Sequence, residues 1–227
     1  GHFLVGAAHR LARHLSRIRA VGQGESEPSP LLYQQALRDV IGRCLYGVDI
    51  NPMAAELCRV GLWLEALEPG KPLSFLEHHI RVGNSLLGAT PELIAAGVPD
   101  AAFKSMDGDD KRACSVLKRR NRGERDTLTP LFAQYEAETQ RKLEQAAAVL
   151  EQLPDDRPED VRAKELAFRR HEQTDEYRSK KWLADAWCAA FLLTKRFAEP
   201  GLESSAVGLT QSNVNALAEG STLPEHL

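Results

Sequence analysis

The segment that decides the fold is Tyr46-Gly47-Val48-Asp49-Ile50-Asn51-Pro52. The apolar run from Cys44 to Val48 is too short for a helix, so it predicts a buried β-strand that ends at Asp49. Asn51 is a good helix N-cap, and Pro52 suits the first helical position. The sequence therefore predicts a strand that passes directly into a helix, with an acidic residue between them.

The flanking residues extend this pattern. Helices are expected at 4–18 and 31–42, and the helix after Pro52 is expected to run to about Glu68. That helix is expected to bury an apolar face, made of Leu57, Val60, Gly61, Leu64 and Leu67. A second strand, Ile80-Arg81-Val82, follows. The order strand, helix, strand is typical of a parallel α/β layout.

Beyond residue 90 the chain is charged and favours helices. Residues 128–153 and 158–181 predict the arms of an antiparallel helical hairpin, with a turn between them. A more apolar stretch, 182–197, predicts a buried helix. The Gly-, Ser- and Asn-rich residues 200–227 are expected to form a flexible tail. We therefore expect three regions, with boundaries after residues 90 and 199.

The composition excludes several classes of protein. The chain has 227 residues, of which 43% are hydrophobic and 27% charged, which suits a globular protein with a real core. It has no long uninterrupted apolar run, so no membrane span is expected. The 4 cysteines show no C-x-x-C spacing, so a cytoplasmic protein without disulfides is expected. His78-His79 has no carboxylate or thiolate at ligand spacing, so no metal site is expected.

Asp49 and Asn84 are the polar residues that follow the two expected strands. An acid at the carboxyl end of a parallel strand lies where nucleotide cofactors bind, and its two oxygens can accept both ribose hydroxyls. The Asn84 amide could recognise an adenine edge. The alternative is that Asp49 only caps its turn and that Asn84 only occupies a tight turn.

Cations gather in two stretches, although the net charge of -3 gives no indication of nucleic-acid binding. Residues 1–24 contain arginines and no acid. The run Lys118-Arg119-Arg120-Asn121-Arg122 could contact DNA phosphates through Lys118, Arg119, Arg120 and Arg122. The alternative is that this run is a solvated helix face.

Four consecutive blocks resemble motifs of the N6-adenine-specific DNA methyltransferases. They are Gly1-His2-Phe3-Leu4, the segment from Leu45 to Ala54, Leu62-Trp63-Leu64, and Gly83-Asn84-Ser85-Leu86-Leu87-Gly88. The resemblance covers residues 1–90 and is closest to the large methylases of restriction and phage-defence (BREX-like) systems. Residues 100–198 resemble the long insert of these enzymes.

The resemblance implies an α/β chain with a partial class I S-adenosylmethionine-dependent methyltransferase (Rossmann-like) fold, helix-dominated and with a long α-helical insert. Residues 1–90 would be the partial cofactor-binding core, and 91–199 the insert. The implied cofactor is S-adenosylmethionine, and the implied partners are double-stranded DNA and the remainder of the methyltransferase chain.

The resemblance also implies roles for individual residues. Asp49 would bind the ribose hydroxyls, Ile50 would pack on the adenine, and Asn84 would lie near the adenine edge, where many relatives have an acid. The glycine-rich cofactor loop would end in the block Gly1, His2 and Phe3.

Two motifs of the family are absent from the sequence. The loop normally reads Ala-Cys-Gly-Ser-Gly-His-Phe, and this chain begins at its last glycine. The Asn-Pro-Pro-aromatic tetrapeptide, which holds the amine of a flipped adenine, is also absent, because Asn51-Pro52 is followed by Met53. We therefore expect a fragment of a longer methyltransferase, with no catalytic residue and no activity on its own.

Two other function classes stay open. The hairpin at 128–181 and the basic run are also consistent with a non-catalytic helical module that binds DNA or a protein. A nicotinamide-dependent dehydrogenase would use the same acid after a strand, although no intact G-x-G-x-x-G is present.

Overall fold

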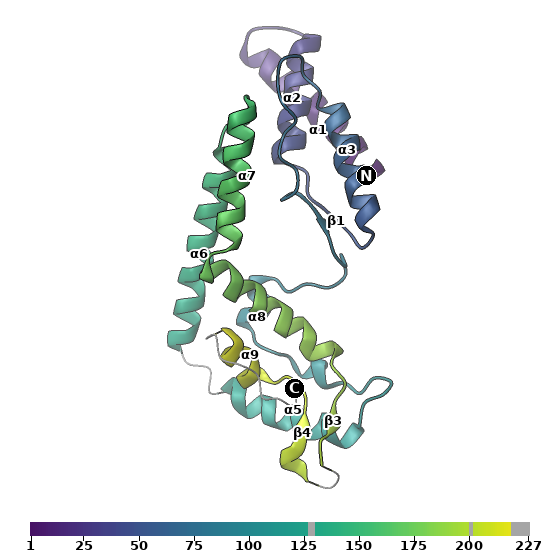
Figure 1. The fold of residues 1–227 in the computed structure, drawn as a ribbon, viewed down its shortest axis with the longest axis vertical. Helices are drawn as coiled ribbons and strands as arrows, with labels where there is room; N and C mark the ends of the chain where they lie inside the picture. Colours follow the sequence, from purple (N-terminus) through teal and green to yellow (C-terminus); the bar gives the residue numbers. More distant parts are fainter. Residues whose placement is uncertain (127–129, 200–201, 219–227) are drawn as a thin grey trace. The chain divides into compact units, whose positions relative to one another are not determined.

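A computed structural model describes residues 1–126, 130–199 and 202–218 (Figure 1). The chain divides into two compact units. The first contains Gly1–Leu86 and Ala147–Arg170, and the second contains Leu87–Ala146 and His171–Leu227. The boundary expected after residue 199 is wrong, and the one expected after residue 90 falls at Leu86, because part of the expected insert packs with the first unit.

The first unit follows the expected order of elements. Its helices and strands are α1 (His2–Gly22), α2 (Pro30–Arg43), β1 (Gly47–Asp49), α3 (Pro52–Glu65) and β2 (Ile80–Val82), joined by the end of α6 (Pro130–Gln152) and most of α7 (Pro158–Glu172). The Asn51 side chain accepts hydrogen bonds from the backbone N–H groups of Met53 and Ala54, so α3 begins at the predicted cap.

β1 and β2 pair in parallel, which confirms the predicted strand–helix–strand arrangement. In this pair Gly47 lies opposite Ile80, and Asp49 lies opposite Val82. β1 begins at Gly47 rather than Cys44, ends at Asp49 as predicted, and is largely exposed rather than buried. A Cβ atom on Gly47 would lie 2.9 Å from Leu4 Cδ1, so glycine allows α1 to approach this strand.

The expected buried face of α3 is wrong. Leu57 and Leu64, which belong to that face, are 65% and 63% exposed. The helix instead buries Ala55, Cys58, Arg59 and Leu62. On this face Ala55, Cys58 and Leu62 pack in the core of the unit, and the Arg59 guanidinium donates to the Ile80 carbonyl from Nε (3.2 Å) and Nη2 (2.7 Å) and so joins α3 to β2.

The turn between α6 and α7 belongs to the first unit and contacts α2 and the segment that follows α3. Arg38 of α2 donates to the Asp155 carbonyl (Nη2 to O, 3.0 Å), and Lys71 Nζ lies 3.0 Å from Asp156 Oδ1. The first arm of the predicted hairpin is α6, and α7 forms the second arm only to Glu172, because residues 175–181 belong to the next helix. The sequence also predicts an apolar seam along the first arm, at near-heptad spacing. Its members Leu143 and Leu150 are half-buried, and those at 128–135 lie outside the described side chains.

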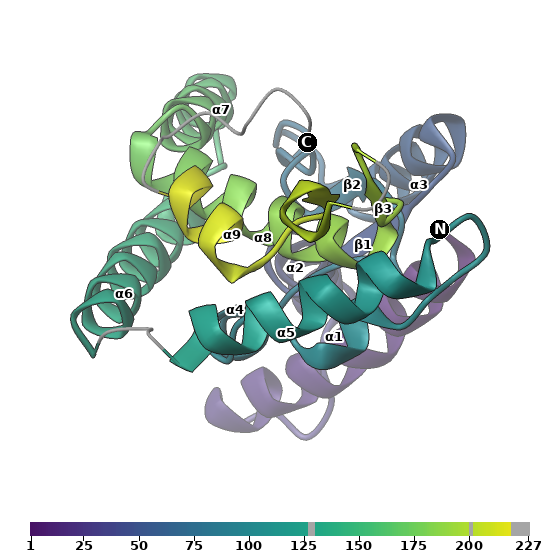
Figure 2. The same ribbon diagram turned by 90° about the horizontal axis from the view of Figure 1, so that it is seen from below.

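The second unit is built around α5 and α8. Its elements are α4 (Pro91–Ala95), the 3-10 helix η1 (Asp100–Phe103), α5 (Lys111–Asp126), α8 (Asp175–Leu192), β3 (Arg196–Phe197), the 3-10 helix η2 (Glu203–Ser205), β4 (Ala206–Val207) and α9 (Gln211–Ala218). Helix α9 packs beside α8 (Figure 2). The core contains Phe103, Leu117, Leu183 and Trp187. The sequence predicts a buried helix over 182–197; α8 provides it, but it begins earlier, at Asp175, and ends at Leu192.

Residues 202–218 correct the prediction of a flexible tail. β4 pairs antiparallel with β3, and Val207, Leu209 and Val214 are buried in the core of the second unit. No helix within the described ranges combines the length and the apolar character that crossing a membrane requires.

Candidate functional site

The carboxyl ends of β1 and β2 bring Asp49 and Asn84 to one edge of the sheet. The backbone N–H of Gly83 donates to the Asp49 carbonyl at 2.9 Å, which continues the pairing of the two strands. The Asp49 side chain uses Oδ1 to accept the Asn51 N–H (2.9 Å), and Asn84 Oδ1 accepts the Leu86 N–H (2.9 Å). Both side chains therefore cap turns, as the alternative interpretation predicted, and both are exposed at this edge.

Asp49 and the next residue offer a hydrogen-bond acceptor beside an apolar surface. The turn uses one oxygen of its carboxylate, and the neighbouring Ile50 is 72% exposed. An acceptor beside an exposed apolar side chain matches the two surfaces of a ribose with its base.

The block Gly1, His2 and Phe3 lies exposed at the start of α1. A Cβ on Gly1 would lie 3.1 Å from Cys58 Cα, so glycine allows this end of α1 to touch α3. Phe3 is 92% exposed.

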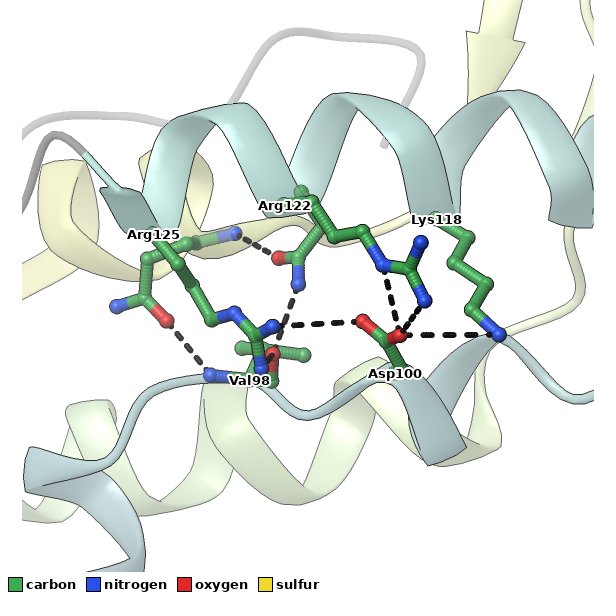
Figure 3. Close-up of polar contacts among 7 residues, drawn as sticks. Val98, Asp100, Lys118, Arg122 and Arg125 are labelled. Atoms are coloured by element: carbon green, nitrogen blue, oxygen red, sulfur yellow. Dashed lines mark hydrogen bonds and ion pairs between the residues drawn. The ribbon is translucent and has the colours of Figure 1, made fainter.

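The predicted basic run lies on α5, where Asp100 holds two of its cations (Figure 3). Arg122 donates to Asp100 from Nε at 2.8 Å, and Lys118 Nζ lies 3.7 Å from the same carboxylate oxygen. Arg125 Nη2 lies 3.4 Å from the other oxygen. The hydrogen bond from Arg122 lowers the pKa of Asp100, and the neighbouring cations add to this effect.

Other residues of the run also make contacts within the second unit. Asn121 is fully buried; its amide donates to the Val98 carbonyl (2.8 Å) and its oxygen accepts the Gln211 N–H (2.8 Å). Arg120 reaches the Ser204 and Ala206 carbonyls at 3.5 Å. Arg119 is exposed, and its side chain makes no hydrogen bond or ion pair to another residue that the structure describes. The run is therefore partly a structural element of α5.

A second group of cations lies on α1. Arg10, Arg13, His14 and Arg17 line a shallow depression of about 650 Å³. Within the described parts of the chain these arginines form no ion pair, whereas Arg19 pairs with Asp39 at 2.7 Å. We call Arg10, Arg13 and Arg17 the α1 basic face.

A buried polar cluster joins His78 and His79 to Glu151 of α6. His79 Nε2 lies 3.1 Å from Glu151 Oε1, and His78 Nε2 lies 3.4 Å from the same oxygen. Tyr46 donates its hydroxyl to that oxygen at 3.1 Å, and its ring stacks on His79 at 4.2 Å. This carboxylate is 72 positions from His79, so no local spacing in the sequence connects it to the histidines.

Burial controls the ionisation of this cluster. It lowers the pKa of His78 to about 4 and also lowers the pKa of His79, although the Glu151 carboxylate opposes both shifts. Burial alone would raise the pKa of Glu151, but the hydrogen bond from His79 and the other nearby groups outweigh it, and the pKa is lowered. Burial and the Glu151 charge raise the pKa of Tyr46 to about 12. At neutral pH the cluster therefore holds neutral imidazoles and a charged carboxylate.

Part of the chain is similar to a known restriction-modification protein. It is 35% identical over 97 residues to a protein of Methanocaldococcus jannaschii named "Putative type II restriction enzyme and methyltransferase". The aligned part is 39% of this chain and 8% of that protein, so the chain spans less than a tenth of its relative. The similarity supports a relationship with a restriction-modification methyltransferase, without distinguishing which atom of the base is methylated. No known family matches the chain, and no solved structure matches it.

Proposed function

We propose that the chain is part of an S-adenosylmethionine-dependent, adenine-N6-specific DNA methyltransferase of a restriction-modification or phage-defence system. The observation that carries the proposal is the parallel pairing of β1 with β2, which brings Asp49 and Asn84 to one sheet edge. The partial similarity to a restriction enzyme and methyltransferase supports the same conclusion. The proposal includes a class I methyltransferase fold, in which helices α6 to α8 belong to the helical insert.

In this proposal the residues of the sheet edge bind the cofactor. The Asp49 carboxylate accepts the ribose hydroxyls, Ile50 packs on the adenine ring, and the Asn84 amide lies at the adenine edge. S-adenosylmethionine supplies the methyl group when it is bound. No residue of 1–227 is assigned to the transfer itself, because the Asn-Pro-Pro-aromatic motif is absent from this sequence.

Replacing Asp49 by alanine is expected to weaken S-adenosylmethionine binding by about ten- to a hundredfold. The loss corresponds to about 1.5–3 kcal/mol, the contribution of a hydrogen bond to a charged group. Isothermal titration calorimetry on the full-length natural protein that contains residues 1–227 would measure this loss of affinity. Asp107→Ala, which removes an exposed acid of the second unit, is the matched control. An Asp49→Ala affinity equal to that of the control would refute the ribose assignment.

The α1 basic face is expected to contribute more to DNA binding than the run on α5. Its arginines have no described acidic partner, whereas Asp100 already holds Lys118 and Arg122. Each phosphate contact contributes about 0.9 to the slope of log affinity against log salt concentration. The triple variant of the α1 basic face to glutamine should therefore reduce the slope by about 2–3, and Arg122→Gln by less than about 1.

Fluorescence anisotropy with a labelled duplex, over a series of salt concentrations, would compare these variants. Arg119→Gln is a useful third variant, because Arg119 is the exposed member of the run. An unchanged slope in the triple variant would remove α1 from the DNA-binding surface.

A further inference from the structure

We propose that His78, His79 and Glu151 form a binding site for a divalent transition-metal ion, with Zn²⁺ as the best-fitting candidate. Each residue offers one ligand atom, and these atoms all lie within 4.8 Å of one another. The site is separate from the sheet edge assigned to the cofactor, and methyl transfer from S-adenosylmethionine does not require it.

The first argument is geometric. Ligand atoms that lie ~2.0–2.2 Å from a tetrahedral Zn²⁺ lie ~3.3–3.6 Å from one another. The observed separations of Glu151 Oε1 from His79 Nε2 and His78 Nε2 are 3.1 Å and 3.4 Å. Two of the three ligand–ligand separations are therefore already close to the lengths that Zn²⁺ requires, and the two histidine ligand atoms lie within 4.8 Å of each other.

The second argument concerns buried polar atoms without partners. Glu151 Oε2 and the Nδ1 atoms of His78 and His79 are buried and have no hydrogen-bond partner within the described structure. An unpaired buried polar atom is costly. Glu151 Oε1, in contrast, receives contacts from both histidines and from Tyr46. Of these unpaired atoms only Glu151 Oε2 belongs to the proposed coordination sphere, as the second oxygen of the ligating carboxylate, because each Nδ1 points away from the Nε2 atom that faces Glu151.

The surroundings determine which ion fits. Two imidazoles and a carboxylate favour Zn²⁺ and its neighbours in the transition series over Mg²⁺ and Ca²⁺, which prefer oxygen ligands. Tyr46 donates to Glu151 and so orients it, as a group behind a metal ligand does. The positive charges of Lys164 and Arg81 lie nearby and repel a bound cation, so the negative charge of Glu151 is needed to offset that repulsion. Three protein ligands leave a fourth position for water.

Isothermal titration with Zn²⁺, on the purified chain stripped with a chelator, would test the proposal. We expect saturable 1:1 binding by the natural sequence and at least tenfold weaker binding by Glu151→Gln. Glu144→Gln is the matched control, because Glu144 is an exposed acid on the same helix, and its affinity should equal that of the natural sequence. Mg²⁺ should give no binding at this site.

A second variant and a spectroscopic measurement distinguish loss of the metal site from loss of the folded structure. Circular dichroism would first establish that Glu151→Gln is folded, and His78→Gln would replace it if it were not. Co²⁺ in place of Zn²⁺ should produce visible absorption bands in the natural chain that are absent from the variant. Equal Zn²⁺ affinity in the natural chain and the folded variant, or no saturable Zn²⁺ binding, would overturn the proposal.

Discussion

Replacing Leu62 by alanine is expected to lower the free energy of unfolding of the first unit by about 2–5 kcal/mol. Leu62 lies on α3, is 0% exposed and packs in a core that includes Leu37, Ile41 and Leu76. Truncation of its side chain removes buried methyl groups and leaves a cavity that the neighbouring helices fill only in part. Urea denaturation, followed by circular dichroism, would measure the loss.

Leu64→Ala is the matched control, because Leu64 lies two residues later on the same helix and is 63% exposed. Its expected effect is within about 0.5 kcal/mol, as for most surface substitutions. The pair of variants distinguishes the observed orientation of α3 from the one that its hydrophobic pattern predicts, which buries Leu64. A larger loss for Leu64→Ala than for Leu62→Ala would mean that α3 presents its other face to the core.

Local signals predicted the elements of the first unit well, because local interactions determine where helices begin. Asn51 and Pro52 define the start of α3, and the parallel pairing of Val48 with Arg81 follows from the order strand, helix, strand. The orientation of α3 was not predictable in this way. The face that it buries includes Arg59, which donates to the Ile80 carbonyl, and a hydrophobic pattern counts arginine as a solvent-facing residue.

Pairing of polar groups that are far apart in the sequence explains why the ordered residues 202–218 and the role of Glu151 were not predicted. The composition of residues 200–227 indicated a tail, yet Gln211 is buried because its N–H and its side-chain oxygen are paired with Asn121 and Val98. The same applies to Glu151, whose partners are the adjacent histidines of a distant segment. In both cases a polar side chain lies at least partly inside its unit, where its partners come from distant parts of the sequence.

Lowering the pH from 7 to 5 is expected to destabilise the metal-free first unit by about 2 kcal/mol through His78 alone. The pKa of His78 is about 4 in the folded chain, whereas an exposed histidine titrates near 6.5. Because the folded pKa is the lower one, the unfolded chain binds more protons. The stabilisation is therefore complete above about pH 6.5 and is lost as the pH falls toward 4.

The groups around His78 reinforce this direction. His79, Lys164 and Arg81 lower its pKa in addition to burial, and Glu151 opposes them without reversing the shift. The pKa of His79 is also lowered, so its protonation adds to the loss. The pKa of Glu151 is lowered, so Glu151 stays charged at pH 5, and its own contribution is lost only at more acidic pH.

Urea denaturation between pH 5 and 8, in the presence of a chelator, would separate His78 from the other histidines. His78→Gln should flatten the dependence of the unfolding free energy on pH, because glutamine does not titrate. His14→Gln, at an exposed position of α1, is the matched control. Since Zn²⁺ requires neutral imidazoles, added Zn²⁺ should stabilise the natural chain more at pH 7 than at pH 5. A pH dependence that is identical in the natural chain and in His78→Gln would show that His78 is not held neutral by burial.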